Sequence, residues 1–229
     1  MNGIQKLFAE VPGTYQFVNH ILTGGLDILW RRRAVRIAVE EGGGNWLDVC
    51  TGTGETAAYL SRYAPVGTEV FAADFSMPML MHAAGSSGRE TVHFSAADAD
   101  QLPFPDATFD LVTISFATRN INTSRSALQR RLVEFRRVLK PGGRFVNLET
   151  SQPGSRILRI VVHGYVGTVV RPLGGMISGS RAAYSYLSET IPRFYPADEF
   201  ARIISDAGFT DVRSTPLFFG VAAIHQGVA

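Results

Sequence analysis

A short apolar segment that ends in two glycines constrains the fold of this chain more than any other feature. Residues 46–49 (Trp-Leu-Asp-Val) indicate a buried strand, and Gly52 and Gly54 follow it one residue apart. A second apolar run, residues 70–73, ends in Asp74, twenty positions after Gly54. A glycine turn after one parallel strand and an acid after the next are typical of a site that holds a nucleoside, with the acid on the ribose hydroxyls.

The residues after the turn indicate which nucleoside-containing cofactor the site would bind. Glu55 and Thr56 stand where a dinucleotide fingerprint has its third glycine, so the turn is poorly suited to a pyrophosphate. Acidic side chains around the pocket favour a positively charged sulfonium. We therefore expect S-adenosylmethionine as the cofactor, with S-adenosylhomocysteine as its product. A nicotinamide oxidoreductase, which would bind NAD, is the alternative for the same fold.

The expected cofactor contacts lie at the carboxyl ends of successive strands, where open parallel sheets bind their ligands. Asp74 would accept hydrogen bonds from both ribose hydroxyls. Asp98 would accept one from the adenine amino group, while the Ala99 amide faces a ring nitrogen. Asp48 and Glu55 are candidates for the methionine ammonium group, and Glu55 equally suits the first turn of a helix. The full predicted set is Asp48, Thr51, Gly52, Thr53, Gly54, Asp74, Phe75, Asp98, Ala99 and Ser115.

The composition indicates a folded α/β protein with a full core. Of 229 residues, 45% are hydrophobic and 18% are charged, and the net charge of +2 argues against nucleic-acid binding through bulk charge. Cys50 is the only cysteine, so no disulfide can form within the chain, and we expect a reducing, cytoplasmic location. The uncharged run Ile160–Val170 is shorter than the roughly 20 residues that cross a bilayer.

Alternating apolar strands and amphipathic helices predict an α/β three-layer sandwich around a mostly parallel, seven-stranded sheet. A helix over 124–139 is the clearest, with Ser124 as its N-cap. The last two strands are separated by so tight a turn that they must form an antiparallel pair at one edge. Extra N-terminal helices (1–44) and a helical lid insertion (152–192) complete a single domain, residues 1–229. The predicted strands are 46–50, 69–74, 91–95, 109–115, 144–150, 210–217 and 220–225.

Several motifs outside the glycine turn give the chain a family resemblance. Residues 15–19 (Tyr-Gln-Phe-Val-Asn), with Trp30-Arg31 downstream, form an amino-terminal signature, and residues 114–120 (Ile-Ser-Phe-Ala-Thr-Arg-Asn) form a second one. The chain resembles the class I S-adenosylmethionine-dependent methyltransferases, which implies their Rossmann-like fold. More narrowly, it is similar to the family that C-methylates ubiquinone and menaquinone precursors. Further motifs of the same resemblance, which covers nearly the whole chain, are residues 102–106, 139–143, 148–153, 184–187, 191–194 and 220–225.

The resemblance also implies a substrate pocket beside the cofactor. C-methylation of a quinol ring needs a deprotonated ring hydroxyl, and the unperturbed pKa of a phenol is about 10. A cation about 4 Å away contributes roughly 4 kcal/mol at an effective dielectric of about 20. Arg119, just past the fourth strand, is the predicted catalytic cation; Asn120 would hold the second ring oxygen, and Tyr15 is a third catalytic candidate. The predicted substrate-binding residues are Asn19, Phe116, Arg181 and Tyr184.

A purely structural role is the alternative for each of these residues. Arg119 would also suit a surface salt bridge, Asn120 a turn, and the aromatic residues the core. Gln16 and the pair Ala117-Thr118 depart from the family pattern, which leaves another small aromatic acceptor open. We expect 2-demethylmenaquinol as the acceptor. The alternatives are the benzoquinol of the ubiquinone pathway and a cofactor-binding module without turnover.

The expected partners are a lipid-soluble quinol and the inner surface of a membrane. The apolar segment 157–170 and the arginine run 31–33 suit peripheral contact with anionic lipid. A buried lid with a solvated charged face is the alternative for these segments. A homodimer stays open, and nucleic acid is not expected as a partner. No metal is expected, because the five histidines show no ligand spacing.

Overall fold

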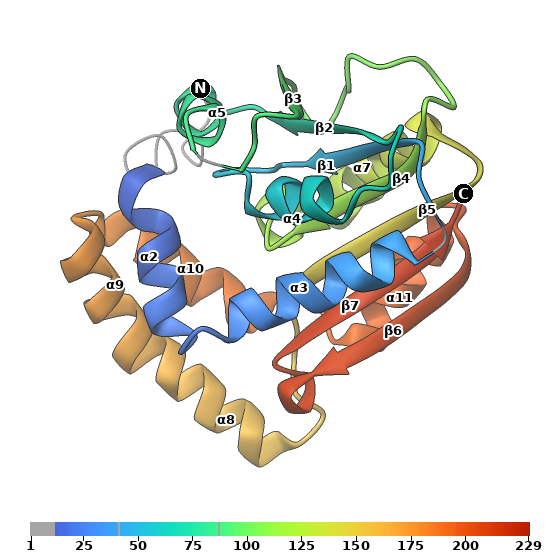
Figure 1. Ribbon diagram of the computed structural model, residues 1–229. Helices are drawn as coiled ribbons and strands as arrows, with labels where there is room; N and C mark the ends of the chain where they lie inside the picture. The colour runs from blue at the N-terminus through green and yellow to red at the C-terminus, as the bar shows by residue number, and fades with distance from the viewer. Residues whose placement is uncertain (1–11, 41, 87) are drawn as a thin grey trace.

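A seven-stranded sheet forms the centre of the molecule (Figure 1). The computed structural model describes residues 12–40, 42–86 and 88–229, with side chains from residue 17 onward. The strand order is β3-β2-β1-β4-β5-β7-β6, and the first five strands in this order are parallel. The strands are β1 (Asn45–Val49), β2 (Glu69–Asp74), β3 (Val92–Ala96), β4 (Phe109–Ser115), β5 (Leu139–Thr150), β6 (Thr210–Leu217) and β7 (Ala222–Val228).

Helices cover both faces of the sheet, as a parallel sheet requires. On one face α3 and α4 pack against the sheet, with Trp30 and Leu60 in one core cluster with Trp46. On the other face α7 and α11 do the same, with Phe135 and Phe200 in a second cluster. The predicted three-layer sandwich is thus confirmed. The covering helices are α3 (Leu26–Val39), α4 (Glu55–Tyr63), α5 (Met77–Ala84), α6 (Thr118–Ile121), α7 (Arg125–Val138) and α11 (Ala197–Asp206).

Helix α7 confirms the clearest helix prediction from the sequence. Ser124 is its N-cap, and the Ser124 Oγ accepts a hydrogen bond from Ala127 N at 3.1 Å. Leu128, Leu132 and Phe135 are fully buried. Their helical spacing places all three on the side of α7 that faces the sheet.

The carboxyl-terminal hairpin supplies the antiparallel strand. β7 runs antiparallel to both β5 and β6, and β6 lies at the outer edge of the sheet. A 3₁₀ turn, Phe218–Gly220, connects the two strands of the hairpin. Phe218 and Phe219 have left-handed backbone angles, with φ of 44° and 56°, and both rings are exposed. The turn therefore presents two aromatic rings to solvent.

A group of helices outside the sandwich forms what we call the lid. Its small core joins Val18 and Leu22 of α2, the first helix among the described residues, to Val166, Val170 and Tyr184. In Figure 1 the lid lies beside α3, away from the first strands of the sheet. The lid consists of α2 (Pro12–Leu22), α8 (Arg156–Tyr165), the π-helical turn η1 (Val166–Val170), α9 (Arg171–Ser178), α10 (Arg181–Thr190) and the 3₁₀ turn η2 (Ile191–Arg193).

Two of the lid helices and η1 join into one unbroken helix of 23 residues, Arg156–Ser178. By length and composition alone, this helix would be able to cross a membrane. The expectation based on Ile160–Val170 counts too few residues, because the helix continues through Arg159 and Arg171. In the fold, one side of this helix packs on α2 and α10. The other side exposes apolar side chains, among them Ile157, Ile160, Val161 and Met176.

Candidate active site

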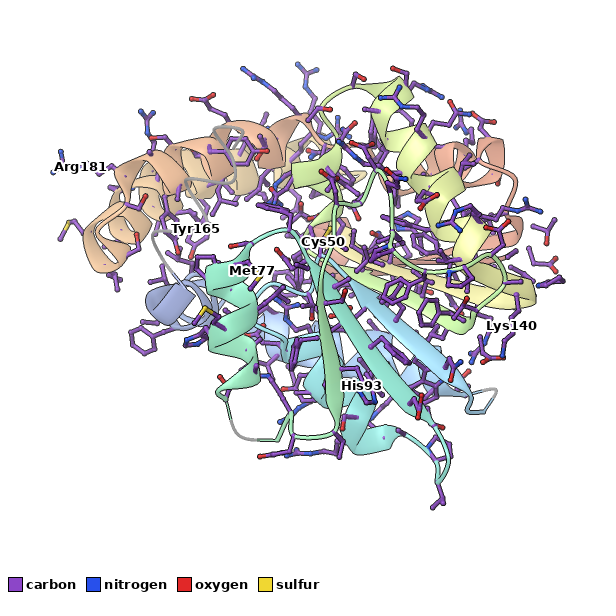
Figure 2. The ribbon with its side chains drawn as sticks, turned by 90° about the horizontal axis from the view of Figure 1, so that it is seen from above. Cys50, Met77, His93, Lys140, Tyr165 and Arg181 are labelled. Carbon is purple, nitrogen blue, oxygen red and sulfur yellow. The ribbon has the colours of Figure 1, made fainter. Side chains whose placement is uncertain are left out.

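A cleft lies at the carboxyl ends of β1, β2 and β4, where the strand order reverses. We call it the polar cleft after the hydroxyl and carboxylate side chains in its lining. Figure 2, viewed from above, shows Cys50 at this place, at the end of the first strand. The lining of the cleft includes Ser76 and six residues of the predicted cofactor set: Thr51, Gly52, Thr53, Asp74, Phe75 and Ser115.

Asp74 connects the glycine turn to the second strand. Its Oδ2 accepts a hydrogen bond from Gly52 N at 2.8 Å, and its Oδ1 accepts one from Ser76 N at 2.8 Å. Gly52 has a φ of 55°, which glycine adopts without strain. Each carboxylate oxygen has a further lone pair, so the group can also accept from two ribose hydroxyls. Burial raises the pKa of Asp74 above its ordinary value.

Asp48 lies beneath the glycine turn and does not line the cleft. Its Oδ2 accepts a hydrogen bond from Thr51 Oγ1 at 2.6 Å, and its Oδ1 accepts one from Thr113 Oγ1 at 2.7 Å. Burial raises the pKa of Asp48 to about 6, even though both threonines and the charge of Arg31 lower it. Asp48 therefore fixes the shape of the turn.

The predicted adenine residues lie beside the cleft, outside its lining. Asp98 is exposed and accepts a hydrogen bond from Asp100 N at 3.0 Å, whereas Ala99 is buried. The preceding residue, Ala97, donates its N–H to Asp74 O at 2.9 Å, so this segment adjoins the edge of the cleft. Gly54 lies behind the lining as well, with a φ of 75°.

A larger cavity, of about 550 Å³, lies between the lid and α3. Its lining is mostly apolar, and Arg119 and Thr150 also reach it. Arg31 and Phe116 line both this cavity and the polar cleft, so the two spaces meet at these side chains. We call it the apolar cavity; its lining includes Leu22, Leu26, Trp30, Val162, Val166 and Leu187.

Arg119 forms a buried ion pair, which the sequence does not predict. Its Nη1 lies 3.1 Å from Glu149 Oε1, and its backbone N–H donates to Glu149 Oε2 at 3.0 Å. Arg119 is 5% exposed and Glu149 is 1% exposed, so the surface salt bridge considered for Arg119 is wrong. Because Glu149 balances the charge of Arg119, the roughly 4 kcal/mol expected from a lone cation is an upper limit. The signal for Glu149 was its place in the motif at 148–153.

The other predicted residues divide between the site and the lid. Asn120 lines the cleft, and its buried Oδ1 has no hydrogen-bond partner among the described residues. Asn19 lines the apolar cavity. Tyr184 is buried in the lid core, and Arg181 is exposed at the outer end of the lid (Figure 2). Neither lines the cleft or the apolar cavity. The side chain of Tyr15 lies outside the described residues.

Arg31 belongs to the site, although the sequence suggests for it only a place in a charged run. Its Nε lies 2.8 Å from Glu55 Oε2, and its Nη1 donates to Thr56 Oγ1 at 3.3 Å. Its guanidinium carbon lies 4.9 Å from the centroid of the Phe116 ring. The available signal was the Trp30-Arg31 pair in the amino-terminal signature.

A histidine–aspartate pair, which the sequence also does not reveal, fastens the lid to α3. His20 Nδ1 lies 2.6 Å from Asp27 Oδ2, and Thr23 Oγ1 donates to Asp27 Oδ1 at 2.7 Å. His20 Nε2 lies 3.8 Å from Glu55 Oε1, at the start of α4. Within residues 12–40, 42–86 and 88–229, no three His, Cys, Asp or Glu side chains gather in a way that could hold a metal ion.

The fold and the cleft define the class of protein. The strand order, the glycine turn after β1 and the acid after β2 are those of an S-adenosylmethionine-dependent methyltransferase of class I. A SAM-dependent methyltransferase from Aquifex aeolicus has a similar fold, with a TM-score of 0.62 and 19% identity over 86% of this chain and 88% of that one. Phosphoethanolamine N-methyltransferase 2 of Haemonchus contortus, solved with S-adenosyl-L-methionine, has a TM-score of 0.61 at 16% identity, over 86% of this chain and 51% of that one.

The chain belongs to the ubiE/COQ5 methyltransferase family, which it matches over residues 1–229. It is 44% identical to the "Demethylmenaquinone methyltransferase" of Thermus thermophilus over 224 residues, which is 96% of this chain and 99% of that protein. It is 38% identical to the "Ubiquinone/menaquinone biosynthesis C-methyltransferase UbiE" of Desulfotalea psychrophila over 226 residues, 99% of this chain and 90% of that protein. The predicted family and enzyme class are confirmed.

Proposed function

We propose that this enzyme transfers the methyl group of S-adenosylmethionine to a ring carbon of a prenylated quinol, and that the acceptor is 2-demethylmenaquinol. The observation that carries the proposal is the junction of two unlike spaces at Arg31 and Phe116. The carboxylates of Asp74 and Glu55 in the polar cleft suit a positively charged donor, and the apolar cavity of about 550 Å³ suits a prenyl tail. A ring at the junction would meet the donor's methyl group while its tail occupies the cavity.

The naphthoquinol is preferred because of the relatives' names. The T. thermophilus protein, at 44% identity, is named for demethylmenaquinone alone. Relatives at 38%, 37% and 39% identity are named for both the ubiquinone and the menaquinone pathways. The benzoquinol of the ubiquinone pathway is therefore the second candidate acceptor.

The residues at the junction have the chemistry that such a transfer needs. When bound, the donor supplies an electrophilic methyl group on a sulfonium. Asp74 would hold the ribose of the donor at the mouth of the glycine turn. Arg119 lines the apolar cavity, and its buried Nε, which has no hydrogen-bond partner among the described residues, would donate to a ring oxygen. Asn120 Oδ1 would accept a hydrogen bond from the second ring hydroxyl. Glu149 holds Arg119 in position.

Within the same proposal, the enzyme works peripherally, at the cytoplasmic surface of a membrane. Three residues that line the apolar cavity are also exposed at its rim: Ile21 by 47%, Tyr165 by 43% and Phe218 by 52%. Exposed apolar side chains of α8, such as Ile157, extend the same surface. A rim of this kind resting on a bilayer would let a prenylated acceptor enter the cavity without crossing water.

The acceptor is tested by giving the full-length enzyme labelled S-adenosylmethionine together with reduced demethylmenaquinone or, separately, the methoxybenzoquinol precursor. Mass spectrometry then shows which ring gains the methyl group. We expect transfer to the naphthoquinol. Faster transfer to the benzoquinol would assign the enzyme to the other pathway, and transfer to neither ring would contradict the proposal.

The role of Arg119 is tested in the same assay. Arg119→Gln should lower kcat by about 100-fold, because a donor to the ring oxygen is lost, while donor affinity stays within about twofold. Arg125→Gln is the matched control, since Arg125 is exposed at the start of α7. Unchanged kcat in the Arg119 variant would remove this residue from the catalytic set.

A further inference from the structure

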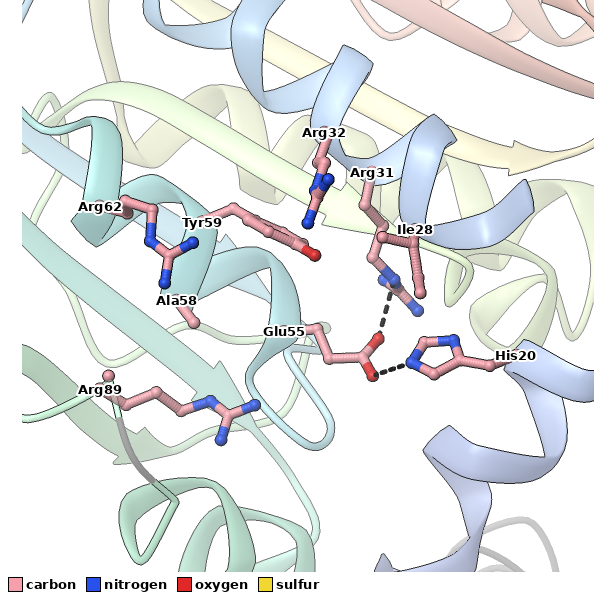
Figure 3. Close-up of a pocket in the computed structure, with 10 residues that line it drawn as sticks. His20, Ile28, Arg31, Arg32, Glu55, Ala58, Tyr59, Arg62 and Arg89 are labelled. Atoms are coloured by element: carbon pink, nitrogen blue, oxygen red, sulfur yellow. Dashed lines mark ion pairs between the residues drawn. The ribbon is translucent and has the colours of Figure 1, made fainter. Parts of the chain in front are cut away.

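A third cavity, of about 210 Å³, adjoins the polar cleft, with which it shares Arg31 and Glu55 (Figure 3). Four arginines line it: Arg31 and Arg32 from α3, Arg62 from α4, and Arg89 from the segment before β3. Figure 3 shows these side chains arranged around the space that Glu55 also faces. Segments far apart in the sequence therefore bring positive charge to one place.

The positive charge of this cavity exceeds its negative charge. Glu55 is the one carboxylate among the described lining residues, and it pairs with Arg31 at 2.8 Å. The formal charge of the lining, four arginines less one glutamate, is thus +3 with His20 neutral. In the described part of the chain, Arg32, Arg62 and Arg89 form no ion pair with a carboxylate.

Arg89 is the least accessible of the four arginines. It is 9% exposed, and its Nε donates to Gly54 O at 3.0 Å. Its two terminal nitrogens make no hydrogen bond to any described residue. Burial lowers the pKa of Arg89, although the charge of Glu55 raises it, so this one carboxylate does not offset the cost of burying the guanidinium. An anion in the cavity would provide the missing partner.

Other side chains add to the lining, and one of them contacts a cation. The guanidinium carbon of Arg32 lies 5.7 Å from the centroid of the Tyr59 ring, within the range of a cation–π contact. His20 from the lid closes the cavity on the side of α2. The cavity is therefore walled by the lid, by α3 and α4, and by the Arg89 segment.

We propose that this cavity binds a phosphate group, either as free phosphate or diphosphate or as the headgroup of an anionic lipid. Arginine donates pairs of N–H groups that match phosphate oxygens, and several arginines from different elements can surround one tetrahedral anion. A phosphate with about two negative charges balances a lining of +3 better than a carboxylate with one. This inference does not depend on which acceptor the enzyme methylates.

The same contacts link the phosphate site to the donor cleft. Arg89 holds the carbonyl of Gly54, and Arg31 and Glu55 line both spaces. A phosphate that engages Arg31 frees Glu55 to face the ammonium group of the donor. Phosphate therefore strengthens donor binding, and by linkage the donor strengthens phosphate binding by the same factor.

Calorimetric titration of the full-length enzyme with inorganic phosphate and with diphosphate, at constant ionic strength, tests the site. We expect saturable binding that Arg62→Gln and Arg32→Gln each weaken by roughly tenfold. Arg33→Gln is the matched control, because Arg33 is exposed on the same helix as Arg32 but does not line the cavity. No saturable binding to the unaltered enzyme, or equal weakening in the Arg33 variant, would overturn the proposal.

Two further measurements identify the source of the phosphate and test the link. Sedimentation with phosphatidylglycerol vesicles, against phosphatidylcholine vesicles, supports a lipid headgroup if diphosphate competes and Arg62→Gln reduces binding more than Arg33→Gln. Binding of soluble phosphate without vesicle dependence supports a free anion. Donor affinity should rise about fivefold with phosphate in the unaltered enzyme and stay constant in Arg62→Gln. Equal donor affinity with and without phosphate in the unaltered enzyme would contradict the link.

Discussion

The carboxyl ends of the strands, called the sheet edge below, and the lid both border the candidate site, but they contribute different kinds of side chain. At the sheet edge, Asp48, Asp74 and Glu149 are buried, and each accepts at least two hydrogen bonds. The lid instead contributes apolar side chains, many of them partly exposed, around a wide cavity. Carboxylates that hold the glycine turn and Arg119 in place are thus carried on β1, β2 and β5, where the backbone fixes them. The lid provides area and shape, which tolerate a flexible ligand.

The largest effect is expected where the sheet edge buries its ion pair. Glu149→Gln leaves the guanidinium of Arg119 buried without its counter-charge, so the free energy of unfolding should fall by about 3 to 5 kcal/mol. Urea unfolding monitored by circular dichroism measures the loss. The double variant Arg119→Met with Glu149→Leu is the control, and it should recover most of the stability while abolishing activity. A Glu149→Gln variant as stable as the parent would show that the buried carboxylate is not needed to stabilise Arg119.

Two buried groups of the sheet should give opposite pH dependences of stability. Burial raises the pKa of Asp48 from 3.8 to about 6, so the folded state holds the extra proton and stability falls as pH rises through this window. Burial lowers the pKa of His225 from 6.5 to about 4, so the unfolded state holds the extra proton and stability rises from pH 4 to 6.5. Each shift corresponds to about 3 kcal/mol.

Single variants separate the two contributions. Between pH 4 and 6.5, Asp48→Asn should leave the rising slope of His225, and His225→Gln should leave the falling slope of Asp48. The measurement is the free energy of unfolding in urea at half-unit pH steps without donor. Variants whose slopes differ from the parent in the same direction would show that one of the two assignments is wrong.

Donor affinity tests whether Asp74, at the sheet edge, holds S-adenosylmethionine. Asp74→Ala removes a charged acceptor from the cleft and should weaken S-adenosylmethionine binding by about 100-fold, or about 3 kcal/mol. Asp98→Ala is the matched control, because Asp98 follows the neighbouring strand but is exposed and outside the lining. Calorimetry measures both. Equal losses in the two variants would place the adenine beside Asp98, as the sequence predicts, and a loss confined to Asp98 would move the donor site away from Asp74.

The smallest effect is expected in the lid. A Cβ on Gly174 would lie 2.0 Å from the ring of Tyr184, so Gly174→Ala forces α9 and α10 apart and should cost about 2 kcal/mol of stability. Gly167→Ala, in the same long helix, is the control, since nothing lies within 4 Å of a Cβ there. Donor affinity should be unchanged in both variants, and acceptor KM should rise only in the first. A loss of donor affinity in Gly174→Ala would show that the two regions are not independent.

The two regions also differ in how far their sequence predicts their structure. The glycine turn and Asp74 could be found because strand ends of a parallel sheet meet at one edge, so local patterns determine which residues are neighbours. The partners of Arg31 and Arg119 could not be predicted, because Glu55 and Glu149 come from other elements. Charge alone does not show which of the 20 acidic residues pairs with each arginine. Residue spacing predicts a helical lid but does not give its packing.

Tyr184 illustrates the limit in the lid. Its place in a family motif predicts a contact with substrate, yet the absence of a Cβ on Gly174 lets its ring pack in the lid core between α9 and α10. A contact of this kind depends on two segments ten residues apart that meet only after the chain has turned. The apolar cavity and the arginine cluster around Arg89 arise in the same way, because each is lined by segments far apart in the sequence.

The pairing of Arg119 with Glu149 has a consequence for the timing of catalysis. In the proposed site the charges of Arg119 and Glu149 balance, so the sulfonium of a bound donor would bring most of the field that ionises a quinol. An acceptor that arrives first would keep its hydroxyl protons. Since the anionic form of a quinol is the one that loses electrons most readily to oxygen, an enzyme waiting for its donor would protect the ring from wasteful oxidation.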